Sequence, residues 1–518
     1  MKVPAHRNLR RAKHAMHTGA AAWPVCAVVL LACAVPALAK DPAQEEVTRD
    51  FEKSFTLSGN QGFSLDHRLG QVHIRGASGR ELKISAKIHV QDRNNADAQS
   101  FAQKIQFDVR ESSDGVHVRT IYPDSKSFLP TIRIGGRTSY SVDYDVTMPA
   151  DAPLWLHNDF GNAEVSGVRG GAQIENGHGI LTVRDVGATR LVNSFGRIEL
   201  SNAAGNGSVT NNNGAVTVSN VKGTLEVRNR FGEIEVSQIT GGATISGGNG
   251  RVSLSGAGGN STVTNSFGAV VVRNITGNLS VSNSNGKIAA SDVTANTELK
   301  TSFGAVEAER IAGPLTVNNN NGSLRLNEIH GFVSATTSFG SVTATYLHKG
   351  ANVVTGNGGI DLNNVEGDVY VKTSFGSVHV ENVKGKLTAQ DSNGAVTAKN
   401  IAADVSVDTS FSGVTLENVA GKILVNNQNG AIDVTAAVGS ACKDIVLKTS
   451  FSHIVIRVPA NAGYRVVART SFGHISSDLP VTATGTMGGD SLNGTIGNGA
   501  CSLALANSNG NIEITRAP

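Results

Sequence analysis

Two histidines and a glutamate recur at one position of a repeating pattern, at a spacing that could bring them together. His330, His348 and Glu366 follow one another at intervals of 18 residues. Imidazole nitrogens and a carboxylate are ligands that zinc and similar ions accept. If the chain returns to the same place every 18 residues, the three side chains form a candidate metal site. The alternative is a solvated polar corner, because the same position elsewhere holds Thr240 and Ala420.

Two cysteines near the C-terminus could react with each other. Cys442 and Cys501 are the cysteines that remain if an N-terminal leader is removed, and two cysteines in an exported chain are compatible with one disulfide. The repeat places them two or three turns apart, farther than a disulfide spans. A four-residue insertion before Ile445 could close that gap, so we expect the disulfide. No other reactive constellation appears, and we expect no catalytic residue and no cofactor.

A phenylalanine recurs every 36 residues, and an Asn-Gly pair recurs midway between successive phenylalanines. The structural unit is therefore 18 residues long, and we count its positions from the Phe or Asn as position zero. We expect the Phe column to be buried as a ladder in the core. Its members are Phe195, Phe231, Phe267, Phe303, Phe339, Phe375 and Phe411.

Aliphatic residues recur at positions 3, 5, 8, 12 and 14 of this unit. The pairs 3/5 and 12/14 alternate as in a half-buried strand, and glycines at positions 1 and 10 suit tight corners. Such a short unit buries its apolar face by stacking on its neighbours. The pattern predicts an all-β protein, namely a single-stranded parallel β-helix (solenoid) with 18-residue rungs and irregular β caps. A propeller blade would need more strands than this unit holds.

The same patterns divide the chain into four parts. Residues 1–39 read as a signal peptide and 40–155 as an N-terminal β-rich cap region with one short helix at 96–104. Residues 156–475 carry the solenoid repeats, and 476–518 form a C-terminal cap. The caps lose the regular spacing, as the ends of a stacked repeat do.

The N-terminal leader has the features of an export signal. A basic start precedes an apolar run at 20–35, and a small-x-small pattern then predicts cleavage between Ala39 and Lys40. Lipoprotein processing at Cys33 is the minor alternative. The apolar run is short for a membrane span, and no later stretch comes near the required length, so no transmembrane segment is expected after signal removal. We expect an exported protein of the periplasm, the outer surface or the medium.

Charge argues against nucleic acid as a partner. The chain has 45 basic and 42 acidic residues, and five of the basic ones lie in residues 1–39. The remaining chain has 40 basic and 42 acidic residues, a net charge of −2. A nucleic-acid-binding protein needs an excess of basic residues on one face.

Several short motifs resemble those of the bacterial putative-adhesin family of parallel β-helix proteins, which is related to the toast-rack domains. The resemblance rests on the segments 146–149, 154–156 and 160–161, on the repeated Gly-x-Val-x-Val rungs, and on 496–499 followed by 509–512. It implies a β-helix over nearly the whole mature chain. The family is largely uncharacterised and supplies no catalytic motif.

These observations favour a non-catalytic envelope or surface protein, an adhesin-like scaffold or interaction platform. Its partner would be an unknown protein or glycan at the cell envelope, and the oligomeric state is left open. The alternative is a polysaccharide-active β-helix enzyme, a lyase or hydrolase. That chemistry needs clustered carboxylates and commonly aromatic side chains that stack on sugars. The acids are scattered, and the outward aromatic residues are few, Tyr346 and Tyr370 among them.

Overall fold

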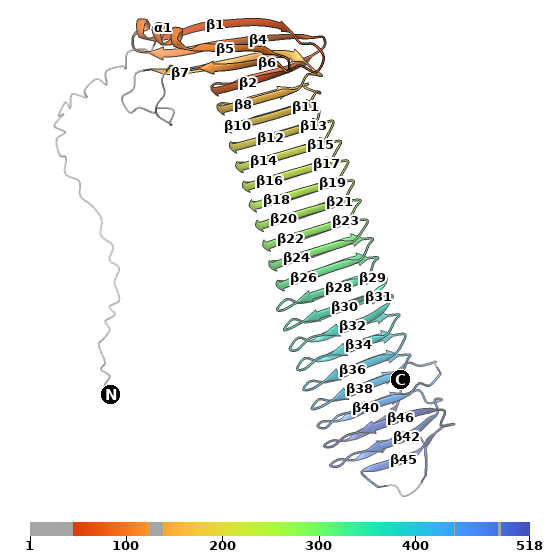
Figure 1. Cartoon of the computed structure of the whole chain (residues 1–518). Helices are drawn as coiled ribbons and strands as arrows, with labels where there is room; N and C mark the ends of the chain where they lie inside the picture. The colour runs from red at the N-terminus through yellow and green to blue at the C-terminus, as the bar shows by residue number, and fades with distance from the viewer. Residues whose placement is uncertain (1–44, 124–137, 440, 485–487) are drawn as a thin grey trace, which may run out of the picture. The chain divides into compact units, whose positions relative to one another are not determined.

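Each 18-residue repeat folds as one rung with two short strands, and the rungs stack in parallel and in register (Figure 1). The computed structural model describes residues 45–123, 138–439, 441–484 and 488–518, within the unit Gln44–Pro518. In one rung, β22 (Leu279–Asn285) leads into β23 (Ile288–Val293). Strands of the first kind stack into sheet B and those of the second kind into sheet A. The predicted all-β parallel solenoid is confirmed.

Sheet A of the stack contains strands that follow the Phe or Asn corner. They are β9 (Ala163–Ser166), β11 (Leu181–Val186), β13 (Ile198–Ala203), β15 (Val216–Val221), β17 (Ile234–Ile239), β19 (Val252–Ala257), β21 (Val270–Ile275), β23, β25 (Val306–Ile311), β27 (Leu324–Ile329), β29 (Val342–Leu347), β31 (Ile360–Val365), β33 (Val378–Val383), β35 (Val396–Ile401), β37 (Val414–Val419), β39 (Ile432–Ala436) and β41 (Ile454–Val458).

Sheet B contains strands that lead up to that corner. They are β8 (Leu154–Phe160), β10 (Ala172–His178), β12 (Thr189–Phe195), β14 (Gly207–Asn213), β16 (Leu225–Phe231), β18 (Ala243–Asn249), β20 (Ser261–Phe267), β22, β24 (Thr297–Phe303), β26 (Leu315–Asn321), β28 (Val333–Thr337), β30 (Gly350–Thr355), β32 (Asp368–Lys372), β34 (Leu387–Gln390), β36 (Val405–Thr409), β38 (Ile423–Asn427) and β40 (Ile445–Lys448).

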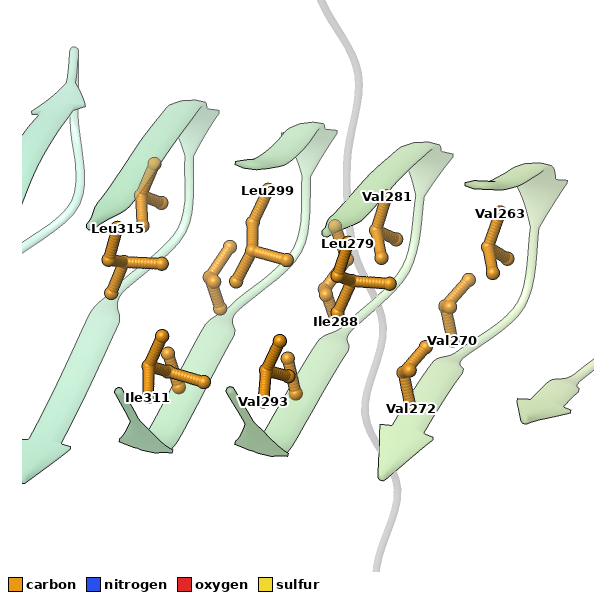
Figure 2. Close-up of a cluster of buried hydrophobic side chains, with 14 of the residues drawn as sticks. Val263, Val270, Val272, Leu279, Val281, Ile288, Val293, Leu299, Ile311 and Leu315 are labelled. Atoms are coloured by element: carbon orange, nitrogen blue, oxygen red, sulfur yellow. The ribbon is translucent and has the colours of Figure 1, made fainter. Parts of the chain in front are cut away.

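The core lies between the two sheets and is almost wholly aliphatic (Figure 2). Val270 pairs with Ile288 and Ile288 with Val306, so position 3 forms one vertical file as predicted. Across the interior, Val281 pairs with Leu299 in sheet B. All of these side chains are at most 1% exposed. Each contributes about 1.5–3 kcal/mol by leaving water, which no single rung could achieve alone.

The Phe column is not part of this core, so that prediction is wrong. The seven side chains are 40–66% exposed. Position zero has the parity of an inward residue, but it lies at the end of its sheet B strand or just beyond it, where the chain turns to the other sheet. The space inside that corner is already filled by the residue two positions earlier. The residues that were predicted to be buried and are exposed are Phe195, Phe231, Phe267, Phe303, Phe339, Phe375 and Phe411.

The residue that fills this corner belongs to a buried polar column that the sequence analysis did not identify. Its side chains are Asn or Thr in most rungs, with one Asp, and they are at most 6% exposed. Asn283 donates hydrogen bonds from Nδ2 to the carbonyls of Gly268 (2.9 Å) and Gly286 (3.1 Å). Members include Asn193, Asn211, Asn229, Asn265, Asn283, Thr301, Asn319, Thr337, Thr355, Thr373, Asp391, Thr409, Asn427 and Thr449.

The opposite corner turns through a left-handed residue at position 7. Asn382, Asn400 and Asn418 have φ of 57–59° there, a conformation that Asn tolerates better than most residues. Their amides form a ladder, with Nδ2 of Asn418 donating to Oδ1 of Asn400 (2.8 Å) and Asn400 to Asn382 (2.9 Å). This ladder fastens successive rungs at their outer edge.

The N-terminal region contributes both a rung and a cap. The strands β2 and β3 pair in parallel with β8 and β9, so the stack begins inside the predicted cap region. The strand β7 joins β3 of sheet A in parallel, and β4 and β1 then extend that sheet in antiparallel order. The strand β6 joins β2 of sheet B in parallel, and β5 pairs with it in antiparallel order. The predicted short helix is present as α1. These elements are β1 (Glu45–Thr56), β2 (Gly62–Leu69), β3 (Val72–Ala77), β4 (Glu81–Asp92), α1 (Asn95–Lys104), β5 (Gln106–Ser112), β6 (Gly115–Ile121) and β7 (Ser139–Pro149).

We expected residues 476–518 to form a C-terminal cap. In the structure they also contribute one rung to the stack. The last two strands insert as a rung between the strands of 445–458 and those of 464–477. Only two strands close sheet B in antiparallel order. The elements here are β42 (Tyr464–Arg469), β43 (Ile475–Ser477), β44 (Val481–Ala483), β45 (Ser491–Ile496), β46 (Cys501–Ala506) and β47 (Ile512–Arg516).

Candidate functional site

The exposed Phe column forms a raised edge along one corner of the stack, which we call the Phe edge. It comprises the seven exposed Phe residues of the repeat, from Phe195 to Phe411, together with Phe451 and Phe472, which are 53% and 78% exposed. Successive rungs are about 4.8 Å apart, so Phe side chains two rungs apart are separated by about 9.6 Å. An Asn lies between them in the repeat, for example Asn285 between Phe267 and Phe303. This edge is the most extended apolar feature that the described residues present to solvent.

The predicted metal ligands lie in one column but do not converge on a point. The rings of His330 and His348 stack face to face, with centroids 4.4 Å and planes 6° apart. Ring nitrogens point outward in the plane of each ring, so parallel rings cannot both direct a lone pair at an ion between them. Nδ1 of His348 lies 3.1 Å from Oε2 of Glu366, and Nζ of Lys384 donates to Oε1 (2.8 Å).

The ammonium group of Lys384 therefore competes with any metal for Glu366. Its hydrogen bond, followed by that of His348, holds the pKa of Glu366 below the ordinary value. Within the described ranges no group of three His, Cys, Asp or Glu side chains is arranged to hold a metal. The column is a polar ladder on a solvated corner.

Cys442 and Cys501 are joined by a disulfide, with their Cα atoms 6.0 Å apart. The expected separation of two or three rungs is wrong, because Cys501 begins β46, which pairs directly with β40. The late strand insertion brings Cys501 next to the loop that carries Cys442. The bond therefore links the inserted C-terminal rung to the repeat that precedes it.

A groove of about 880 Å³ lies across the first strands of sheet B. Its floor is one file of outward side chains at the same register position in eight successive parallel strands. It includes Trp155, and we call it the Trp155 file. The order along the stack is β6, β2, β8, β10, β12, β14, β16 and β18. The corresponding residues are His117, Ser64, Trp155, Gln173, Arg190, Ser208, Glu226 and Thr244.

The groove is hollow because small residues occupy the corner before these strands. Gly171, Ala188, Asn206 and Gly242 line that side. The result is a straight recess that runs along the stack rather than into it.

Most charges near the groove are already paired. The carboxylate of Asp114 accepts hydrogen bonds from Ser112 and from Nε2 of His117, which hold its pKa below the usual range. Glu226 forms an ion pair with Arg228 on the same strand. Arg190, by contrast, makes no ion pair with any residue in the described part of the chain, and its side chain is exposed.

The groove was not predictable from the sequence for a specific reason. Five of the eight floor residues lie at position 13 of the repeat, from Gln173 to Thr244, and that column is visible in the sequence. Ser64 and His117 come from the N-terminal region, where the spacing is lost, and only the parallel pairing of β2 and β6 extends the file to them.

The leader and its processing sites, Ala39, Lys40 and Cys33, lie outside the described residues. Among the described residues no helix is long and apolar enough to cross a membrane.

Comparisons with known proteins bear on the C-terminal part of the stack. Residues 348–515 match the family model described as Toastrack DUF4097. A search of curated proteins finds no match. The solved structure of a "putative cell adhesion protein" from Clostridium sporogenes aligns over 90% of this chain and 100% of its own, at 8% identity and a TM-score of 0.16. That score is too low to carry an argument. Residues 348–515 are thus similar to the toastrack family, which confirms the resemblance to the toast-rack-like β-helix family of unknown function.

Proposed function

We propose that the protein is an exported, non-catalytic scaffold of the cell envelope or surface, adhesin-like, which offers its long faces to partners. The observation that carries this proposal is the Phe edge. Soluble monomers rarely expose extended apolar surface, and such surfaces commonly mark interaction sites. Burying these side chains against a partner would be favourable, and the regular repeat keeps them exposed to solvent in one line.

The neighbours of the Phe edge support a contact role. The residue before each Phe is Ser at Phe267, Phe303, Phe339, Phe375 and Phe411. These small, uncharged side chains let a partner approach the rings without desolvating ions, a step that is costly when the charge is left unpaired. A partner of the Phe edge therefore needs apolar groups at matching intervals.

The location is tested by fractionating the native host and probing intact cells with a protease. The proposal expects the protein in the periplasm, on the surface or in the medium. Recovery in the cytosol with an intact leader would exclude export.

The interaction role is tested by adsorption of the purified protein to isolated envelopes. A triple variant should adsorb more weakly than wild type while melting at a similar temperature; its changes are Phe267→Ser, Phe303→Ser and Phe339→Ser. The matched control alters the alternate rungs of the same corner, with Asn249→Ser, Asn285→Ser and Asn321→Ser, and should adsorb like wild type. Equal adsorption by all three proteins would show that the Phe edge is not the contact surface.

The alternative activity, a polysaccharide lyase or hydrolase, has its own measurement. Hydrolysis by paired carboxylates needs two acids facing one bond. The groove offers Asp114, in the turn before β6, and Glu226, on β16. They lie several rungs apart and are already paired with other side chains. Release of reducing ends from a panel of neutral and uronic-acid glycans would replace the scaffold proposal with an enzyme.

A further inference from the structure

The Trp155 file has a composition unlike that of the rest of sheet B. It combines one indole ring, an amide, hydroxyl groups and an unpaired guanidinium along a straight recess. Trp155 lies nearly parallel to His157, with ring centroids 6.1 Å and planes 14° apart. The rest of the file is polar, so the groove suits a ligand that is itself amphipathic along its length.

The shape of the groove selects an extended ligand. Eight strands span seven steps of about 4.8 Å, so the file is about 34 Å long. A compact metabolite would fill only a small part of this length. A linear polymer lying along the stack would meet a new side chain at each rung.

The backbone of the groove excludes the usual mode of binding an extended peptide. Peptides add to a sheet through the unpaired N–H and C=O groups of an edge strand. Here the strands from β2 to β18 are paired on both sides, and the groove lies on the face of the sheet. Recognition must come from side chains, as it does for sugars, whose hydroxyls need polar groups and whose C–H faces stack on aromatic rings.

The charges on the groove floor indicate that its ligand is negatively charged. Arg190 lies near the middle of the file, between Gln173 and Ser208, and has no acidic partner among the described residues. A guanidinium binds a carboxylate through two parallel hydrogen bonds. The acids of the groove are occupied by His117 and Arg228, so the free charge of the floor is positive.

The corner before the sheet B strands carries paired charges farther along the stack. Lys386, Asp404, Lys422 and Asp444 alternate there, with Nζ of Lys422 3.6 Å from the Asp444 carboxylate. In that stretch Lys422 and Asp444 neutralise each other. Arg190 lies on β12, two positions after this corner, and has no such acidic partner among the described residues, so its charge is available to a ligand.

We propose that the groove over the Trp155 file binds a linear acidic polysaccharide, with Arg190 pairing a uronic-acid carboxylate and Trp155 stacking on a neighbouring sugar ring. This site names a partner class for the proposed scaffold and rests on that function. It is separate from the Phe edge, which lies at the other end of the sheet B strands.

The test uses tryptophan fluorescence, because the chain has two tryptophans, Trp23 in the leader and Trp155 in the groove. The full-length protein carrying Trp23→Phe reports on Trp155 alone. Titration with an oligogalacturonide should give a saturable change in emission. Arg190→Gln should weaken binding by about tenfold or more, the usual effect of losing a charged hydrogen bond. Arg251→Gln, a change to an exposed arginine at the Phe corner, should bind like wild type.

Three titration results with the unaltered groove would overturn the inference. They are no change in Trp155 emission with any glycan, equal affinity for a neutral cello-oligosaccharide, and tighter binding of an acidic peptide of similar length. Equal weakening by both arginine changes would reduce it to general electrostatics and would also overturn it. None of these results affects the fractionation and adsorption tests, so failure of the groove and failure of the scaffold proposal are distinguishable.

Discussion

Nδ2 of Asn283 donates a 2.9 Å hydrogen bond to the carbonyl of Gly268, one rung earlier. The same amide also reaches Gly286, at the corner of its own rung, over 3.1 Å. One buried side chain thus satisfies the backbone of two successive corners. Asn283→Ala should leave both half-buried carbonyls without this donor, and the loss of the two hydrogen bonds should cost about 1–3 kcal/mol. The measurement is the urea midpoint, with amide exchange of residues 279–293 as the local readout.

The rungs themselves provide the control for this prediction. Threonine fills the same place in other rungs, where Oγ1 of Thr355 donates to the carbonyl of Gly340 (3.2 Å) and Thr373 to Gly358 (3.1 Å). Asn283→Thr should therefore lose less stability than Asn283→Ala. If alanine and threonine were equally destabilising, the hydrogen bond would not be the source of the effect.

The fold was predictable because every rung repeats the same side-chain pattern. Val270, Ile288 and Val306 share one position of an 18-residue unit, and stacking is the arrangement that buries all three. The exposure of the Phe edge was not predictable from alternation. Position zero has the same parity as the buried residues before it, and only the corner geometry turns it outward.

The other missed features depend on contacts between segments that are distant in sequence. The insertion of β46 and β47 between earlier rungs follows loops whose lengths do not obey the repeat, so Cys501 appeared too far from Cys442. The groove likewise needs Ser64 and His117 to align with Trp155. Local periodicity carries no information about either event.

Leu299 and Phe303 lie four residues apart on β24 and should respond oppositely to truncation. Leu299 is 0% exposed and Phe303 is 56% exposed. Leu299→Ala should cost about 2–5 kcal/mol, since it removes buried atoms and leaves a cavity. Phe303→Ala should change stability by about 0.5 kcal/mol or less. Urea denaturation of both variants measures the contrast. A large loss of stability for Phe303→Ala would show that the Phe column is part of the core after all.

The disulfide should stabilise the C-terminal rungs more than the rest of the stack. It closes a loop with a sequence separation of 59 residues, for which the chain-entropy model gives about 4 kcal/mol. Replacing Cys442 and Cys501 together by serine should therefore lower the melting temperature. It should also speed amide exchange in β42, β45 and β46.

Amide exchange in distant strands of the same variant provides the control for the disulfide prediction. Exchange in β12 and β14, far along the stack, should stay as in wild type, since each rung contacts only its neighbours. Uniform acceleration through the whole stack would contradict a local effect of the disulfide.

His67 makes the N-terminal cap sensitive to acid. Its side chain is 1% exposed and lies beside Thr120 and Tyr122, with Nδ1 3.3 Å from each hydroxyl. Burial lowers the pKa of His67 from 6.5 to about 4. Between these values the unfolded chain binds a proton that the folded cap does not, so stability is full above pH 6.5 and falls as the pH drops towards 4. The complete loss is about 3 kcal/mol.

The measurement compares urea midpoints, followed by exchange of the β2 and β6 amides, at pH 7 and pH 4.5. Wild type should lose stability between these conditions by about 2–3 kcal/mol more than His67→Gln, which cannot take up the proton. His453→Gln, a change to an exposed histidine, should keep the wild-type dependence. Carboxylates that titrate in the same range are common to all three proteins and cancel in the comparison. An identical acid response in wild type and His67→Gln would mean that His67 is accessible to protons in the folded cap.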